Sequence, residues 1–203
     1  MGLASRDWAE RRRDETRMSI AASAGRLFVE RGFDGTTVED IARDAGISVR
    51  TFYRHCDTKE DALTPILTSG VRNFVSDIRD RPEEEPVETS VHAAFVAGFR
   101  RNSLADIVPG RDLFVILSSV PGMRNRWMAA ALAVTDELRP VIAGRTGLDP
   151  NGLEARLLSH TLIGALTVTL EYWASRSAEE SSDRVDLVKL AASALSIIRF
   201  DRG

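Results

Sequence analysis

Four polar side chains that can bond DNA are concentrated in one short segment of the chain. They are Arg50, Thr51, Tyr53 and His55. An arginine side chain can donate a bidentate pair of hydrogen bonds to guanine, and a threonine methyl group can contact thymine. Tyrosine and histidine side chains can bond phosphate oxygens, which set the register of a protein on DNA without carrying base sequence. The segment therefore has the residue types of a helix that reads DNA.

Two short helices joined by a tight turn are expected to position these side chains. The first is predicted at residues 38–45 and the second at residues 49–56, and Gly46 ends the first. Thr37 and Ser48 are typical N-cap residues. The two helix N-termini would also offer backbone N–H groups to phosphate. This pattern is that of a helix-turn-helix motif.

A third helix, predicted at residues 14–31, would cover the apolar faces of the two short helices, which cannot bury them alone. The basic residues 11–13 come just before this helix and are either a solvated helix start or an arm that touches DNA. Four acidic residues nearby dilute their charge, so both readings stay open. The predicted core of the three helices is apolar and consists of Ile20, Leu27, Phe28, Val38, Ile41, Ala45, Ile47, Phe52 and Cys56.

Residues 24–63 closely resemble the N-terminal domain of the TetR family. The matching elements are Gly32-Phe33, Gly35-Thr36-Thr37-Val38, Ile41-Ala42, Ala45-Gly46-Ile47-Ser48, Thr51-Phe52-Tyr53-Arg54-His55 and Lys59-Glu60-Asp61-Ala62-Leu63. The resemblance implies a homodimer that binds a palindromic double-stranded DNA operator, commonly as a repressor, and whose C-terminal domain binds a ligand. Cys56 departs from the pattern, since the family usually has phenylalanine there.

The resemblance also assigns residue roles. Tyr53, His55 and Lys59 would meet backbone phosphates. The full set of implied DNA contacts is Thr37, Ser48, Val49, Arg50, Thr51, Tyr53, His55 and Lys59.

The domain organisation expected from these features has two parts. A TetR-type DNA-binding domain would occupy residues 14–63, with the motif at about residues 37–56, and a ligand-binding and dimerisation domain would occupy residues 64–203. The chain shows no sustained alternation of apolar and polar residues, so an all-α fold is predicted. Further helices are expected at residues 59–79, 89–102, 111–119, 124–144, 150–176 and 185–200, with a solvated linker at 80–88.

Two residue sets in the C-terminal part are candidates for function, although both could be ordinary core. Residues 121–175 resemble ligand domains that are associated with acyl-CoA-like or other small hydrophobic ligands. Aromatic and polar residues at helical spacing are the candidate pocket: Phe95, Phe99, Phe114, Trp127, His160, Thr161, Gly164 and Thr167. Small and apolar residues of the last two long helices are the candidate dimer interface: Leu157, Ala165, Val168, Leu190, Ala194 and Ile198.

Several function classes are disfavoured. The sequence contains no nucleophile elbow, P-loop, zinc-ligand spacing or glycine-rich nucleotide loop, so no enzyme, metal or cofactor is expected. No apolar run reaches about 18 residues and no signal peptide is apparent, so a cytoplasmic protein without a membrane partner is expected. The net charge of −3 argues weakly against DNA, but a local basic patch can outweigh it. A regulator controlled by a partner protein or by its own level stays the alternative, ahead of a helical enzyme.

Overall fold

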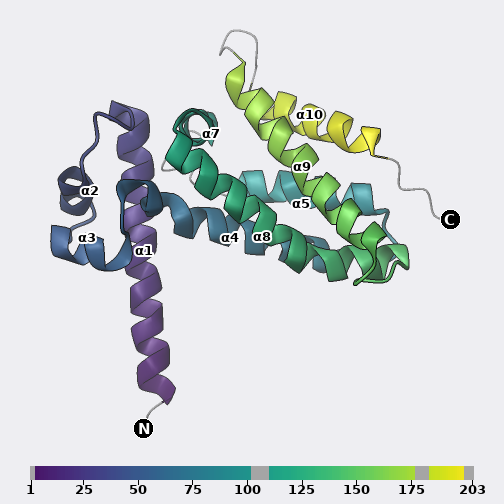
Figure 1. The fold of residues 1–203 in the computed structure, drawn as a ribbon, viewed down its shortest axis with the longest axis horizontal. Coiled ribbons are helices and arrows are strands. Elements are labelled where there is room, and N and C mark those ends of the chain that lie inside the picture. The colour runs from purple at the N-terminus through teal and green to yellow at the C-terminus, as the bar shows by residue number, and fades with distance from the viewer. Residues whose placement is uncertain (1–2, 102–109, 177–182, 199–203) are drawn as a thin grey trace. The chain divides into compact units, whose positions relative to one another are not determined.

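The computed structural model describes residues 3–101, 110–176 and 183–198, and every regular element in these ranges is helical. The all-α prediction is therefore confirmed. Figure 1 shows the elements in chain order. They are α1 (Leu3–Arg31), α2 (Val38–Asp44), α3 (Val49–His55), the 3-10 helix η1 (Lys59–Leu63), α4 (Thr64–Arg79), α5 (Val87–Arg101), α7 (Gly110–Ser119), α8 (Pro121–Thr146), α9 (Leu153–Ser175) and α10 (Asp183–Ile197). None of these helices is both long and apolar enough to cross a bilayer.

The described chain divides into two compact units that are not contiguous in sequence. Unit 1 combines the chain up to Thr68 with α7 and the first turn of α8, up to Arg126. Unit 2 holds α4 from Ser69, α5, α8 from Trp127, α9 and α10. The expected boundary near residue 63 lies close to the first division. The return of α7 to the N-terminal unit has no signal in the sequence.

Unit 1 is built on α1, which packs against α2, η1 and α7. Six of the nine predicted core residues are buried: Ile20, Leu27, Phe28, Ile41, Phe52 and Cys56. The other three, Val38, Ala45 and Ile47, are half-buried. Burial raises the pKa of the Cys56 thiol to about 11, so this side chain is a protonated packing residue where phenylalanine was expected from the resemblance.

Two helix starts differ from the sequence prediction. Helix α1 begins at Leu3 rather than near residue 14, because alanine, arginine and glutamate in the added turns are all strong helix formers. The predicted single helix at 59–79 is divided into η1 and α4. Pro65 then falls in the first turn of α4, where its missing N–H removes no hydrogen bond.

Unit 2 has one apolar core to which α4, α5, α8, α9 and α10 all contribute. Helix α10 packs on both α9 and α5. The predicted solvated linker is instead a structured polar turn. Arg81 pairs with Glu85, whose pKa is lowered to about 2 by the hydrogen bonds from Arg81 and Ser90. Arg145 of α8 donates hydrogen bonds to the carbonyl oxygens of Ile78 (2.6 Å), Arg81 (2.7 Å) and Pro82 (2.6 Å), and so closes the C-terminus of α4.

Candidate nucleic-acid interface

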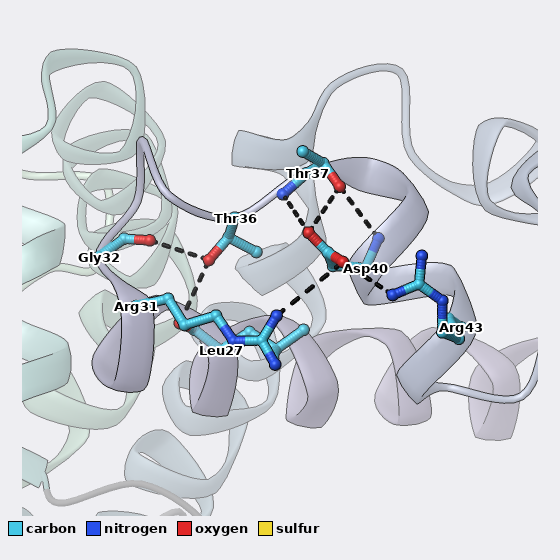
Figure 2. A network of polar contacts seen from close by, with 7 residues as sticks. All are labelled: Leu27, Arg31, Gly32, Thr36, Thr37, Asp40 and Arg43. Atoms are coloured by element: carbon cyan, nitrogen blue, oxygen red, sulfur yellow. Dashed lines mark hydrogen bonds and ion pairs between the residues drawn. The ribbon is translucent and has the colours of Figure 1, made fainter.

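A capping box fixes the start of α2. The Thr37 hydroxyl accepts a hydrogen bond from the Asp40 N–H (3.1 Å) and donates one to Asp40 Oδ2 (2.7 Å), as Figure 2 shows. The Thr37 N–H also donates to Asp40 Oδ2 at 3.2 Å, and the bonds that the Thr37 hydroxyl and N–H donate to this carboxylate, together with the one from Arg43, lower the pKa of Asp40. Both polar groups of Thr37, a predicted DNA contact, are therefore already engaged, and the N–H groups that follow it at the start of α2 are the ones that phosphate would meet.

The loop before α2 is held by a buried threonine and by two glycines. Thr36 is buried, and its hydroxyl donates to the carbonyl oxygens of Gly32 (2.8 Å) and Leu27 (3.2 Å) at the end of α1, as Figure 2 shows. A Cβ atom at Gly35 would lie 2.4 Å from the Arg31 carbonyl oxygen, so this position excludes any side chain. Gly32 has φ +75°, which favours glycine. The path from α1 to α2 is thus tightly specified.

Helix α3 is anchored at its start and in its middle. The Thr51 N–H donates to Ser48 Oγ at 3.1 Å, and the two hydroxyl oxygens lie 2.9 Å apart. Phe52 is fully buried. The turn from α2 needs Gly46 at φ +67°. These anchors determine which face of the helix is presented outward.

The outward face of α3 carries the side chains that can read DNA. Arg50 and Arg54 are exposed, and 53% of Tyr53 is exposed while its ring packs edge-on against Phe52. Val49 and Thr51 are half-buried. The arrangement gives one short helix with guanidinium and phenol donors on a single free face, as a helix in a major groove requires.

His55 lies at the C-terminal end of α3 and is half-buried. Burial, and then the nearby charges of Arg54, Arg17 and Arg13, lower its pKa below the ordinary value of 6.5. The ring is therefore neutral at pH 7. Its Nδ1 atom is buried and has no hydrogen-bond partner among the described residues. Any phosphate bond from His55 would be a neutral one, donated from the other ring nitrogen.

Lys59 has a structural role that the sequence did not predict. Its ammonium group donates to the carbonyl oxygens of Phe33 (2.8 Å) and Thr36 (3.1 Å), and it lies 4.0 Å from the centroid of the Phe33 ring. Two of its three protons are thus used within the protein. Lys59 therefore ties η1 to the loop between α1 and α2, and its phosphate contact stays a prediction that would use the third proton.

Two ion pairs that sequence reasoning missed hold the module together. Arg26 of α1 pairs with Asp44 at the end of α2. Arg126, at the start of α8, bonds Asp61 Oδ1 at 2.6 Å and Thr58 Oγ1 at 3.1 Å. Asp61 also accepts from the Thr58 N–H at 2.8 Å. Burial raises the pKa of Asp61, but these bonds together outweigh it and lower the pKa.

The predicted pocket residues divide between the two units. Phe114 belongs to unit 1, whereas Trp127 and the rest belong to unit 2. Phe95, Phe99 and Thr167 are half-buried and Trp127 is buried. Phe99 also packs edge-on against the buried Trp173, with ring centroids 5.4 Å apart. Trp173 was not singled out from the sequence.

Three of the predicted pocket residues lie on the outside of α9. His160, Thr161 and Gly164 are exposed. His160 Nδ1 lies 2.9 Å from the Arg156 carbonyl oxygen, and the Thr161 hydroxyl donates to the Leu157 carbonyl oxygen at 2.8 Å. That they line a ligand pocket stays a prediction. Apolar residues occupy both faces of this helix, so the sequence does not indicate which face is buried.

The same outer face of α9 is apolar. Among the predicted interface residues, 56% of Leu157 and 63% of Val168 are exposed. Ala165, Leu190, Ala194 and Ile198 are half-buried, and Ile198 packs on the core of unit 2. Further exposed apolar residues, Leu153, Tyr172 and Ile197, were not predicted. Monomeric proteins rarely leave such stripes open to water.

No cluster of three or more metal-ligating side chains occurs in the described part of the chain. Two family models match the sequence. One, described as bacterial regulatory proteins of the tetR family, matches residues 20–63. The other, described as the MftR C-terminal domain, matches residues 85–199, which is more than half of the chain.

Individual relatives agree with these matches. The HTH-type transcriptional regulator TcmR of Streptomyces glaucescens is 30% identical over 146 residues, which cover 69% of this chain but only 64% of TcmR. The HTH-type transcriptional activator FasR of Mycolicibacterium smegmatis is 25% identical, over 79% of this chain and 73% of FasR.

A solved structure has a similar fold. FadR of Thermus thermophilus, described as a TetR-family transcriptional repressor in complex with lauroyl-CoA, aligns with a TM-score of 0.60. The alignment covers 89% of this chain and 92% of that one, at 20% identity. Likeness at that identity shows the fold alone.

Proposed function

Because the chain belongs to the TetR family of bacterial regulatory proteins, and is thus a DNA-binding transcription regulator rather than an enzyme, we propose that it is a homodimeric repressor of a palindromic operator. The observation that carries this proposal is the outward face of α3. Ser48 caps the helix, Phe52 anchors it, and Arg50 and Tyr53 remain exposed. Arg50 reads a base and Tyr53 bonds a phosphate.

A dimer is required by the geometry of DNA and fits the surface of α9. Two copies of α3 must stand about 34–36 Å apart to enter successive major grooves. The exposed stripe that includes Leu153, Leu157, Val168 and Tyr172 gives each protomer an apolar face that a second copy would cover. The half-sites of the operator are then expected about one helical turn apart.

A small hydrophobic or acyl-type ligand is proposed to release the operator. The lauroyl-CoA described in the FadR structure supports this ligand class for the fold. Helices α4 and α8 each contribute residues to both units. If a ligand displaced either helix in unit 2, the displacement would pass along the same continuous helix into unit 1. Linkage then requires that DNA and ligand weaken each other's binding by the same factor.

The test begins with selection of random duplex DNA by the purified protein, followed by sequencing. We expect a palindromic consensus, and Arg50→Ala is expected to keep DNA binding while losing preference at one base pair of each half-site. No enrichment at low salt would contradict DNA reading by this protein.

The ligand is tested next on the selected duplex, with lauroyl-CoA as the probe and free coenzyme A as its control. Release by lauroyl-CoA alone supports an acyl-type inducer. Unchanged operator affinity at saturating lauroyl-CoA would contradict the acyl class and leave the DNA-binding function standing. The sign of regulation is read from a reporter gene, since the relatives include both an activator and a repressor.

A further inference from the structure

The N-terminal half of α1 extends beyond the core of unit 1. Helix α1 has 29 residues, and its first fully buried residue is Ile20. From residue 10 to residue 19 every side chain is exposed except Thr16, which is half-buried. Trp8 is also 60% exposed. In Figure 1 this purple segment projects past α3 without packing on another element of unit 1.

Such a helix has little to stabilise it within unit 1. Most helical stability in proteins comes from packing an apolar face, and isolated helices of this length are marginal in water. A helix that is polar on all sides commonly bridges to a partner or depends on pairs along its own surface. Two of the contacts on its surface join exposed side chains: Arg17 and Asp14 lie 4.0 Å apart, and the Arg12 guanidinium lies 5.2 Å from the centroid of the Trp8 ring.

The charges on this segment are not evenly distributed. Arg13 and Arg17 precede Ile20 by seven and three residues, and Ala24 follows it by four. This spacing places both arginines on the face of α1 that continues into the buried side of unit 1. Of the nearby acidic residues that the structure describes, Glu10 shares that face, Asp14 lies at its edge and Glu15 lies on the opposite face.

The same face lies close to the C-terminal end of α3. After burial, the charges of Arg54, Arg17 and Arg13 lower the pKa of His55 at that end. Asp57 is the first acidic residue beyond the helix end, and it is exposed. Arg13 and Arg54 form no ion pair with any described residue. Helices α1 and α3 therefore both carry exposed guanidinium groups on the side of unit 1 where His55 lies.

We propose that Arg13 and Arg17 of α1, together with Arg54 of α3, form a second DNA-contacting surface that binds backbone phosphates beside the base pairs read by α3. The inference rests on the proposed function, and it extends the interface to a helix segment outside the helix-turn-helix motif. Arginine matches the geometry of phosphate oxygens bidentately. Binding would also supply a charge partner for Arg13 and Arg54, which pair with no described residue.

The test compares two double variants that remove the same charge from the same segment. Arg13→Gln/Arg17→Gln changes the proposed surface, and Arg11→Gln/Arg12→Gln is the matched control on other faces of the helix. Glutamine keeps helix propensity. The probe is the duplex recovered by wild-type selection, with flanks of about one helical turn on each side. Circular dichroism confirms that both variants stay helical.

The expected result is specific to the first variant. Its affinity for the duplex falls about tenfold, and the slope of log affinity against log salt is reduced by about 0.9 for each phosphate that the variant no longer binds. Hydroxyl-radical protection shrinks at the flanks, while the selected consensus stays unchanged. The control variant keeps the wild-type slope and footprint.

Three outcomes would overturn the inference. Equal weakening of both variants would mean that only net charge matters, and wild-type behaviour of both would mean that α1 does not touch DNA. In either case the wild-type protein still selects an operator, so the proposed function survives. A wild-type protein that binds no duplex would overturn the proposed function and this inference together.

Discussion

The two units of this protein are specified by different kinds of interaction. In unit 1 the helices α2 and α3 have seven residues each, too few to be stable alone. Their positions depend on caps at Thr37 and Ser48 and on the steric limit at Gly35. In unit 2 long helices meet through a common apolar core. Short helices need particular residues at particular positions, whereas long ones need mainly an apolar face of the right size.

This difference matters for function. Presenting Arg50 and Tyr53 to a groove requires α3 to be held in one orientation, so a recognisable residue pattern is imposed on unit 1. An apolar core tolerates many exchanges of similar volume. The fold of unit 2 can therefore persist while its sequence varies.

The sharpest test of the contrast replaces one glycine in each unit by alanine. Gly35→Ala places a methyl group 2.4 Å from the Arg31 carbonyl oxygen. We expect it to destabilise the protein by roughly 3 kcal/mol, because backbone must move to accept it. Urea unfolding monitored by circular dichroism measures the loss, together with weaker operator binding.

Gly144→Ala is the matched change in unit 2. Gly144 is exposed on α8, and a Cβ atom there meets no atom within 4 Å. Alanine is therefore expected to stabilise the helix by about 0.5–1 kcal/mol. We therefore expect Gly35→Ala to lower the urea midpoint and Gly144→Ala to raise it. A shift of both midpoints in the same direction would contradict the proposed difference between the units.

A substitution of Arg145 could contradict the difference proposed between the two units. Its guanidinium group closes the carbonyl end of α4 through three hydrogen bonds of 2.6–2.7 Å. Arg145→Ala leaves partly buried carbonyl oxygens without donors, and we expect a loss of about 2 kcal/mol. Arg139→Ala, on the same helix, is the control. A loss much larger than that from Gly35→Ala would show that unit 2 depends on specific polar contacts as strongly as unit 1.

What could be predicted follows the same division. The helix-turn-helix was predictable because caps and glycines act within a few residues, so their signals are local. The bond between Arg126 and Asp61 was not, because its partners are 65 residues apart and carry no local mark. His160 was placed inside unit 2 by its apolar neighbours, but Leu157 and Val168 turn out to be exposed too. The helical spacing of apolar residues predicts that a helix has an apolar face, but it does not predict which other part of the protein packs on that face.

The roles proposed for Arg50 and Tyr53 separate base reading from phosphate binding within one helix face. Arg50→Ala is expected to reduce discrimination at one base pair about tenfold, or ~1.4 kcal/mol. Tyr53→Phe is expected to weaken all duplexes alike and to lower the salt slope, since only a phosphate bond is removed. Competition binding against single-base variants of the selected duplex distinguishes the two. Full discrimination by Arg50→Ala would show that another residue reads that base.

The smallest effect is a pH dependence, which can be tested at one carboxyl group in each unit. The folded-state pKa of Asp61 lies below its ordinary value of 3.8, and that of Glu85 falls from 4.5 to about 2. A lowered folded-state pKa means that the native state binds fewer protons than the unfolded state. The stabilisation is therefore complete above the unfolded-state pKa and is lost as pH falls through the folded-state pKa.

Asp61→Asn is expected to cost about 1 kcal/mol at pH 7, since it weakens one charged hydrogen bond to Arg126. The difference from wild type should shrink as pH falls below the ordinary pKa of 3.8 and through the lowered folded-state pKa. Glu85→Gln should show the same sign, with its difference lost as pH falls through about 2. Urea unfolding from pH 2 to pH 7 measures both. A constant difference across that range for Asp61→Asn would mean that Arg126 is held by Thr58 and the Gly122 carbonyl rather than by the carboxylate charge.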